Sequence, residues 1–153
     1  MKGNEYRDLI AGYIFRNFGD YDLQVYTEVG VGKTITGKDR QVDVFVLNRR
    51  DQRAIAIECK YQNAPGTTDE KIPYALEDLA AMRIPGCLAY AGSGWSRGIL
   101  HTLEASPLAA SCLPDPQGYH RSKSTRELDH VLAATFGLWA QIIPKQRLFT
   151  PPE

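Results

Sequence analysis

Two apolar segments joined by a short polar link constrain the fold of this chain more than any other feature. Residues 41–48 (QVDVFVLN) and residues 53–60 (RAIAIECK) both have the alternating pattern of a β-strand, and the link RRDQ between them has four residues. A link of this length predicts an antiparallel hairpin. Its even length also predicts the register, with Asp43 directly opposite Glu58.

A helix and a further strand are expected after the hairpin. Residues 70–83 carry Ile72, Leu76 and Leu79 at helical spacing, and residues 86–92 (GCLAYAG) form a short apolar run. A strand, helix and strand in this order form a right-handed unit in nearly all cases, and its two strands are parallel. We therefore expect a mixed sheet in which the strand at 53–60 runs parallel to the strand at 86–92.

The rest of the chain adds one strand and three helices to this core. The strand is expected at 22–32 and the helices at 4–18, 95–105 and 124–139, with an irregular connection at 106–121. The sequence has no internal repeat or low-complexity segment, and 153 residues are most simply one domain. We expect a single α/β domain over residues 1–153, with C-terminal helices after a mixed central sheet.

Composition excludes several classes of protein. No apolar run approaches the roughly 20 residues of a membrane-spanning helix, and the N-terminus has no apolar signal core, so we expect a cytoplasmic protein without a membrane partner. Three cysteines without a CxxC pair argue against a disulfide framework and a cysteine-rich zinc site. Eighteen basic and eighteen acidic residues give no net charge, so a nucleic-acid partner must be argued from local features.

The predicted pairing of Asp43 with Glu58 carries chemical information. Two carboxylates about 5 Å apart on one face of a sheet repel each other by about 3 to 4 kcal/mol, and a divalent cation between them removes that repulsion. Mg²⁺ prefers one or two carboxylates together with waters and phosphate oxygens. Lys60 projects from the same face as Glu58 and can orient or deprotonate a nucleophile there. The implied reaction is phosphodiester hydrolysis.

These residues resemble a known family. Val42 and Asp43, followed by IECK at 57–60, are similar to the motif of the PD-(D/E)XK nuclease superfamily, with Val42 where the family name has proline. The resemblance covers about residues 4–105. It implies a restriction-endonuclease-like αβββαβ core, with catalytic roles for Asp43, Glu58 and Lys60.

The resemblance also implies the surroundings of the metal. Mg²⁺, with Mn²⁺ as an expected substitute, would be held by Asp43, Glu58 and the backbone carbonyl of Cys59. Many members add an acid from the first helix, for which Glu5 is the candidate, with Asp8 as the less favoured substitute. The alternative reading of Asp43, Glu58 and Lys60 is a cross-strand salt-bridge cluster.

Several further residues are candidates for contact with DNA. They lie just after the catalytic strand, in the GSGWS segment beside it, or in a basic stretch before the hairpin: Gln62, Lys71, Ser93, Trp95, Lys38 and Arg40. For each of them a structural role, as a solvated loop residue or, for Trp95, as part of the core, stays open.

The leading functional hypothesis is a Mg²⁺-dependent endodeoxyribonuclease of the restriction, junction-resolving or repair type. The alternative is a non-catalytic module that binds nucleic acid or protein on a nuclease-like fold. A homodimer is also considered, because cutting both strands of a duplex needs two sites related by a twofold axis. Its contact would come from apolar residues in the C-terminal segment: Leu128, Leu132, Phe136, Trp139, Ile142, Ile143, Leu148 and Phe149.

Overall fold

The structure, a computed structural model, describes residues 1–143 and 145–153 and centres on a five-stranded mixed sheet. The strands lie in the order β1-β2-β3-β4-β5. Pairing is antiparallel between β1, β2 and β3 and parallel between β3, β4 and β5. Their bounds are Leu23–Lys33, Asp39–Asn48, Ala54–Tyr61, Gly86–Ala91 and Ala109–Ser111.

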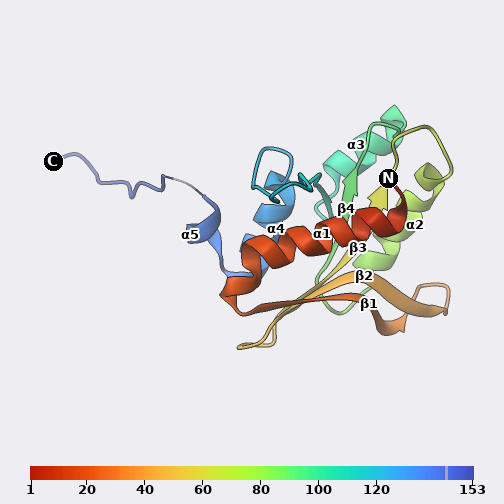
Figure 1. Ribbon diagram of the computed structural model, residues 1–153, viewed down its shortest axis with the longest axis horizontal. Coiled ribbons are helices and arrows are strands. Elements are labelled where there is room, and N and C mark those ends of the chain that lie inside the picture. The colour runs from red at the N-terminus through yellow and green to blue at the C-terminus, as the bar shows by residue number, and fades with distance from the viewer. Residues whose placement is uncertain (144) are drawn as a thin grey trace.

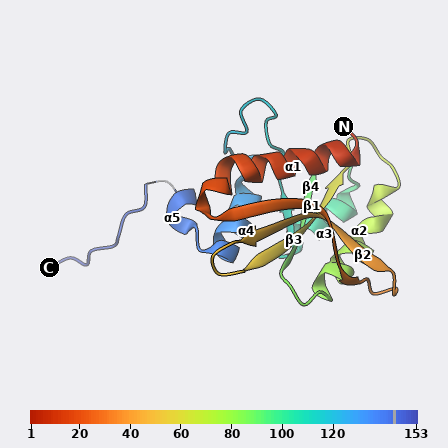
Figure 2. The same cartoon turned by 60° about the horizontal axis from the view of Figure 1, so that its bottom comes forward.

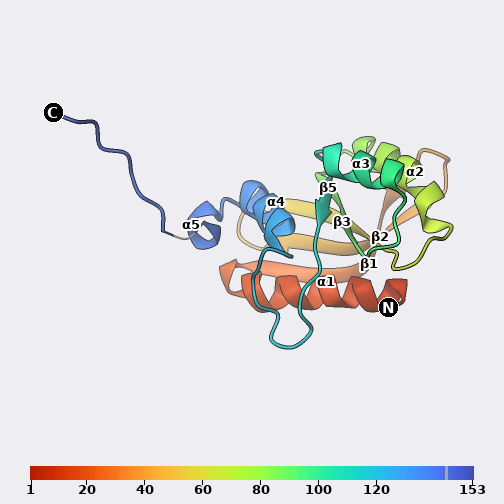
Figure 3. The same ribbon diagram turned by 90° about the horizontal axis from the view of Figure 1, so that it is seen from above.

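Helices cover both faces of this sheet. On one face lie α1 (Gly3–Phe18) and α4 (Arg126–Phe136), whose apolar side chains share a core with those of β2, β3 and β5. On the other face lie α2 (Thr68–Ala80) and α3 (Arg97–Ala105), which form a second, smaller core. Figure 1 shows α1 lying across the strands, and Figure 3 shows α2 and α3 side by side, away from α4. A short 3-10 helix (Gly19–Tyr21) and α5 (Trp139–Ile142) complete the elements.

The alternation of buried residues explains why the hairpin strands lie between two helical layers. In β2 the valines Val42, Val44 and Val46 are fully buried, whereas the residues between them are only partly covered. Because successive side chains of a strand point to opposite faces, one face of β2 packs on α1 and the other holds Asp43 and Phe45.

The structure confirms the predicted hairpin and the parallel crossover. The paired residues of β2 and β3 run from Leu47 with Ala54 to Val44 with Ile57, which is the predicted register. The strands β3 and β4 are parallel and are connected by α2, as the strand–helix–strand pattern indicates.

Two expectations in the C-terminal part were wrong. The connection at 106–121 was expected to be irregular, but Ala109–Ser111 pairs with β4 as a short parallel strand, β5. Three residues give no periodicity to detect, so only the neighbouring strand defines this one. The single helix expected at 124–139 is two helices, because Gly137 has φ +70° and ends α4 in the left-handed conformation.

The apolar residues of α4 are used within the domain. Leu128 and Leu132 are fully buried and Phe136 is nearly so, all in the core with α1, so these three cannot form the predicted dimer contact. Trp139, Ile143, Leu148 and Phe149 are exposed, the last two in a segment that leads away from the body in Figure 2. No helix in the described part of the chain is long and apolar enough to cross a membrane.

Candidate active site

The predicted catalytic residues lie on the face of the sheet that α2 and α3 cover. In the parallel pairing of β3 with β4, Glu58 is beside Leu88 and Lys60 is beside Tyr90. Leu88 and Tyr90 both belong to the core formed with α2 and α3. Neighbouring strands present paired residues on the same face, so Glu58 and Lys60 point toward that layer.

Asp43 and Glu58 interact where the antiparallel ladder ends. The ladder ends at the pair of Val44 with Ile57, and one further step in this register places Asp43 opposite Glu58. The Asp43 carboxylate accepts a hydrogen bond from the Cys59 backbone N–H, with 2.8 Å between Oδ2 and N, which fixes it against β3. Burial, together with the negative charge of Asp43, raises the pKa of Glu58 to about 8, while Lys60 opposes this shift. The site therefore favours a positive charge beside these carboxylates.

Lys60 is half-buried on the same strand face, and its positive charge acts on Glu58 without an ion pair. Within residues 1–143 and 145–153 the ion pairs do not include Lys60. The cross-strand salt-bridge cluster that the sequence left open is therefore absent from the described residues. The Lys60 ammonium is therefore not committed to an ion pair within the described residues.

The two carboxylates fit a hard divalent cation in their chemistry. Carboxylate oxygens are the ligands that Mg²⁺ prefers, and a cation here would reverse the electrostatic cost that raises the pKa of Glu58. However, the described residues contain no group of three or more His, Cys, Asp or Glu side chains arranged to hold a metal. The protein side of such a site would consist of Asp43, Glu58 and the Cys59 carbonyl, completed by water and substrate.

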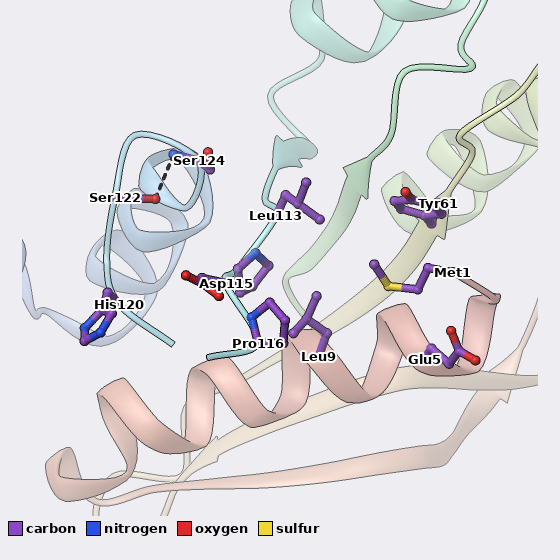
Figure 4. A pocket seen from close by; sticks show the side chains of 11 residues that line it. Met1, Glu5, Leu9, Tyr61, Leu113, Asp115, Pro116, His120, Ser122 and Ser124 are labelled. Carbon is purple, nitrogen blue, oxygen red and sulfur yellow. Dashed lines mark hydrogen bonds between the residues drawn. The ribbon is translucent and has the colours of Figure 1, made fainter. Parts of the chain in front are cut away.

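Glu5 is not brought to these two acids. Its carboxylate accepts a hydrogen bond from the Lys2 backbone N–H at 3.1 Å, which caps the start of α1. Figure 4 shows Glu5 on α1, at a cavity of about 690 Å³ that Leu9 and Tyr61 also line. Because α1 covers the opposite face of the sheet from Glu58, Glu5 does not join Asp43 and Glu58. Its carboxylate instead caps the start of α1. Asp8, the less favoured substitute, is paired with Arg7 at 3.0 Å and is exposed.

Arg40, a candidate for DNA contact, is bound within the protein. Its Nε and Nη2 donate to the two carboxylate oxygens of Asp78 on α2, at 3.1 and 2.7 Å, and both side chains are largely covered. The Arg40 guanidinium holds the pKa of Asp78 below its usual value. This pair fastens the start of β2 to α2 beside Glu58. The sequence does not predict the role of Asp78, because Arg40 and Asp78 are 38 positions apart and no short motif links them.

Gln62 and Trp95 are also internal. The Gln62 amide donates to the Asp69 carboxylate at 2.8 Å and to the Gly94 carbonyl at 2.9 Å, and the residue is buried. The Trp95 indole N–H donates to the Ala91 carbonyl, and its ring belongs to the core with α2 and α3. Neither side chain is placed to contact a nucleic acid, and both have the structural role that the sequence left open.

The start of α3, which follows the GSGWS segment, faces an acid. The Ser96 backbone N–H points at the Asp69 carboxylate, with N to O distances of 3.3 and 3.4 Å. Ser93 is exposed and hydrogen-bonded to Asn63, and Lys38 and Lys71 are exposed. Of the six predicted DNA contacts, these three remain accessible.

A comparison with protein families identifies the chain. The model of the PD-(D/E)XK nuclease superfamily domain matches residues 2–139. The chain belongs to the PD-(D/E)XK nuclease superfamily. The match extends beyond residues 4–105, where the motif resemblance ends, and includes β5 and α4. The mixed five-stranded sheet with flanking helices is the restriction-endonuclease-like fold that this family implies.

Other comparisons add little to this superfamily assignment. No curated protein matches the chain. A crystal structure of a protein of unknown function, AF1548, is 16% identical, with 92% of this chain and 73% of that chain covered and a TM-score of 0.45. A similarity this weak does not bear on the function of the PD-(D/E)XK domain.

Proposed function

We propose that the protein is a Mg²⁺-dependent endonuclease that hydrolyses phosphodiester bonds of DNA. The observation that carries the proposal is the juxtaposition of Asp43 and Glu58, with Lys60 on the same face of β3. Superfamily membership supports a nuclease, and the donor set supports a hard divalent cation, Mg²⁺ with Mn²⁺ as substitute.

Each residue of the site has a distinct task in this proposal. Asp43, Glu58 and the Cys59 carbonyl would hold the cation, which when bound lowers the pKa of a water molecule and offsets negative charge on a phosphate oxygen. The hydrogen bond from Cys59 N–H keeps the Asp43 carboxylate in place before substrate arrives. Lys60 would orient the attacking water or neutralise the charge that develops on the phosphate.

The test is cleavage of linear, nicked, single-stranded and four-way DNA in Mg²⁺ or Mn²⁺. We expect Asp43→Asn, Glu58→Gln and Lys60→Met each to lower the cleavage rate roughly a hundredfold or more. Asp39→Asn is the matched control, because Asp39 is on the same strand as Asp43, is exposed and, within residues 1–143 and 145–153, forms an ion pair only with Lys33. Cleavage that survives Asp43→Asn or Lys60→Met would refute the proposal.

The same set of proteins tests the non-catalytic alternative. A folded wild-type protein that binds DNA equally well with Mg²⁺ and with chelator, and never cleaves it, would be a binding module. The net charge is zero, Arg40 is held by Asp78, and Gln62 and Trp95 are buried, so three of the six residues expected to contact DNA do not support such binding. We therefore expect weak DNA binding in chelator that strengthens when Mg²⁺ is added.

A further inference from the structure

Glu28 has a backbone conformation that does not suit its place in β1. Its φ is +56°, in the left-handed region, and it is the one non-glycine residue of the described ranges that has positive φ inside a strand. A conformation of this kind is unfavourable for a residue with a side chain, and it persists only where other contacts maintain it.

The register of the sheet places Glu28 in one row with the two catalytic acids. On either side of it, Thr27 pairs with Val44 and Val29 pairs with Val42, so residue 28 lies opposite Asp43. The same register on the other side of β2 brings Asp43 opposite Glu58. Three neighbouring strands thus carry an acid at the same level of the sheet.

Arg7 holds the Glu28 carboxylate away from that row. Its Nη1 is 2.6 Å from Oε1 of Glu28, and the Arg7 side chain is largely covered. Arg7 belongs to α1, which covers the face opposite Glu58. The left-handed backbone at residue 28 therefore accompanies a carboxylate that is directed to α1 rather than over Asp43.

We propose that Glu28 is a third carboxylate ligand for the divalent cation of the proposed nuclease, and that Arg7 holds it in reserve while the cation is absent. In an extended backbone, Glu28 projects from the same face as Asp43, with Cβ atoms about 5 Å apart. This inference rests on the proposed function, because that function supplies the cation.

Charge decides between the two positions of Glu28. Without a cation, Glu28 in an extended backbone would add a third carboxylate to the row of Asp43 and Glu58, and like charges at this spacing repel each other. The ion pair with Arg7 competes with that position, but Glu28 is 59% exposed in it, and an exposed ion pair of this kind is weak. When a cation is present, relief of the backbone strain at Glu28 and the new bond from its carboxylate to the cation offset the loss of the ion pair with Arg7.

The experiment measures Mn²⁺ and Mg²⁺ affinity by calorimetry, without DNA, for wild type and five variants. We expect Glu28→Gln to weaken Mn²⁺ binding roughly tenfold. Arg7→Met should tighten it severalfold, because the competing ion pair is gone. Glu104→Gln on α3 is the matched control for the change of charge and should bind as wild type does. Thermal unfolding in chelator checks that every variant is folded.

The double variant Arg7→Met/Glu28→Gln shows whether Arg7 affects cation binding through Glu28 or only through its own positive charge. If Arg7 acts through Glu28, Arg7→Met has no further effect in the Glu28→Gln background; tightening that persists there would overturn the proposal. Equal Mn²⁺ affinity for wild type and Glu28→Gln would also overturn it. If Asp43→Asn still weakens binding in that case, the proposed metal site stands without Glu28. Wild type that binds neither ion at millimolar concentration would refute both proposals.

Discussion

Glu58 shows at the residue scale how a reactive site lowers the stability of the fold that carries it. Burial next to Asp43 disfavours its charged form, so the folded protein holds the Glu58 proton more tightly than the unfolded chain does. The proposed metal site would use this arrangement, because the charge that destabilises the protein is also the charge that attracts a cation.

The first prediction concerns pH. The pKa of Glu58 is about 8 in the folded protein, against 4.5 as its ordinary value, so its contribution to stability is fully present below about 4.5 and is lost as the pH rises toward 8. In chelator, the free energy of unfolding of wild type should fall over this range, by at most about 1.4 kcal/mol per pH unit. The free energy of unfolding of Glu58→Gln should not show this fall with pH. Urea unfolding from pH 5 to 8 measures the difference, and a difference independent of pH would contradict the prediction.

The second prediction links activity to stability. Asp43→Asn removes a negative charge beside Glu58, and the new amide oxygen can still accept the hydrogen bond from Cys59 N–H. We expect this variant to unfold at a higher temperature than wild type in chelator, and to lose both the cleavage activity and the stabilisation that Mg²⁺ gives wild type. An unchanged or lower unfolding temperature would show that the two acids do not repel each other in the folded protein.

At the scale of elements, the Arg40–Asp78 pair holds α2 over the face of the sheet that carries the proposed site. Asp78 also accepts a hydrogen bond from the Ile35 backbone N–H at 3.0 Å, so one carboxylate joins α2, the turn after β1 and the start of β2. We expect Asp78→Asn to lower the free energy of unfolding by about 3 kcal/mol, because the largely covered Arg40 loses its partner. Glu77→Gln, one residue earlier and exposed, is the control. Equal urea midpoints for these two variants would contradict the assignment.

The close approach of the segments after β3 and β4 is a second feature at this scale. A Cβ on Gly94 would lie 2.3 Å from the Ala64 backbone nitrogen, so Gly94→Ala must push the two segments apart. Gly98 in α3 has no atom within 4 Å of such a Cβ. We expect Gly94→Ala to lower the unfolding temperature and Gly98→Ala to raise stability by about 0.5 to 1 kcal/mol. Thermal unfolding that shifted both variants in the same direction would refute this account.

At the scale of the whole molecule, the exposed apolar residues of the C-terminal segment bear on whether two copies of the protein form a dimer. With Leu128, Leu132 and Phe136 used in the core, a twofold contact would have to use the exposed Trp139, Ile143, Leu148 and Phe149. The Leu148 and Phe149 side chains are 92% and 79% exposed, so they contribute little to the stability of a single domain. We expect deletion of residues 145–153 to leave the unfolding temperature unchanged and to weaken any dimer.

Light scattering at micromolar protein, with and without DNA, tests association directly. A monomer in both conditions would rule out a stable dimer and favour a nicking or single-strand activity, since one domain carries one proposed site. A dimer that persists after the deletion would place the contact elsewhere on the molecule.

Local patterns in the sequence determined the centre of the proposed site. The period of two and the four-residue link were enough to predict the hairpin register, and therefore the pairing of Asp43 with Glu58, because loop length and side-chain alternation act over a few residues. The parallel crossover of β3 and β4 was predictable for a similar reason, since its handedness follows from strand twist.

Only the tertiary structure decided which of the other candidates lie near the proposed site and which are held elsewhere. Glu5 caps α1 on the opposite face of the sheet, Arg40 is held by Asp78, and Gln62 and Trp95 are buried by segments far along the chain. The left-handed backbone of Glu28 depends in the same way on Arg7, 21 residues away. Such contacts depend on how helices and strands pack in three dimensions. The spacing of apolar residues in a sequence predicts helices and strands, but it does not predict which polar side chains will form hydrogen bonds or ion pairs with each other.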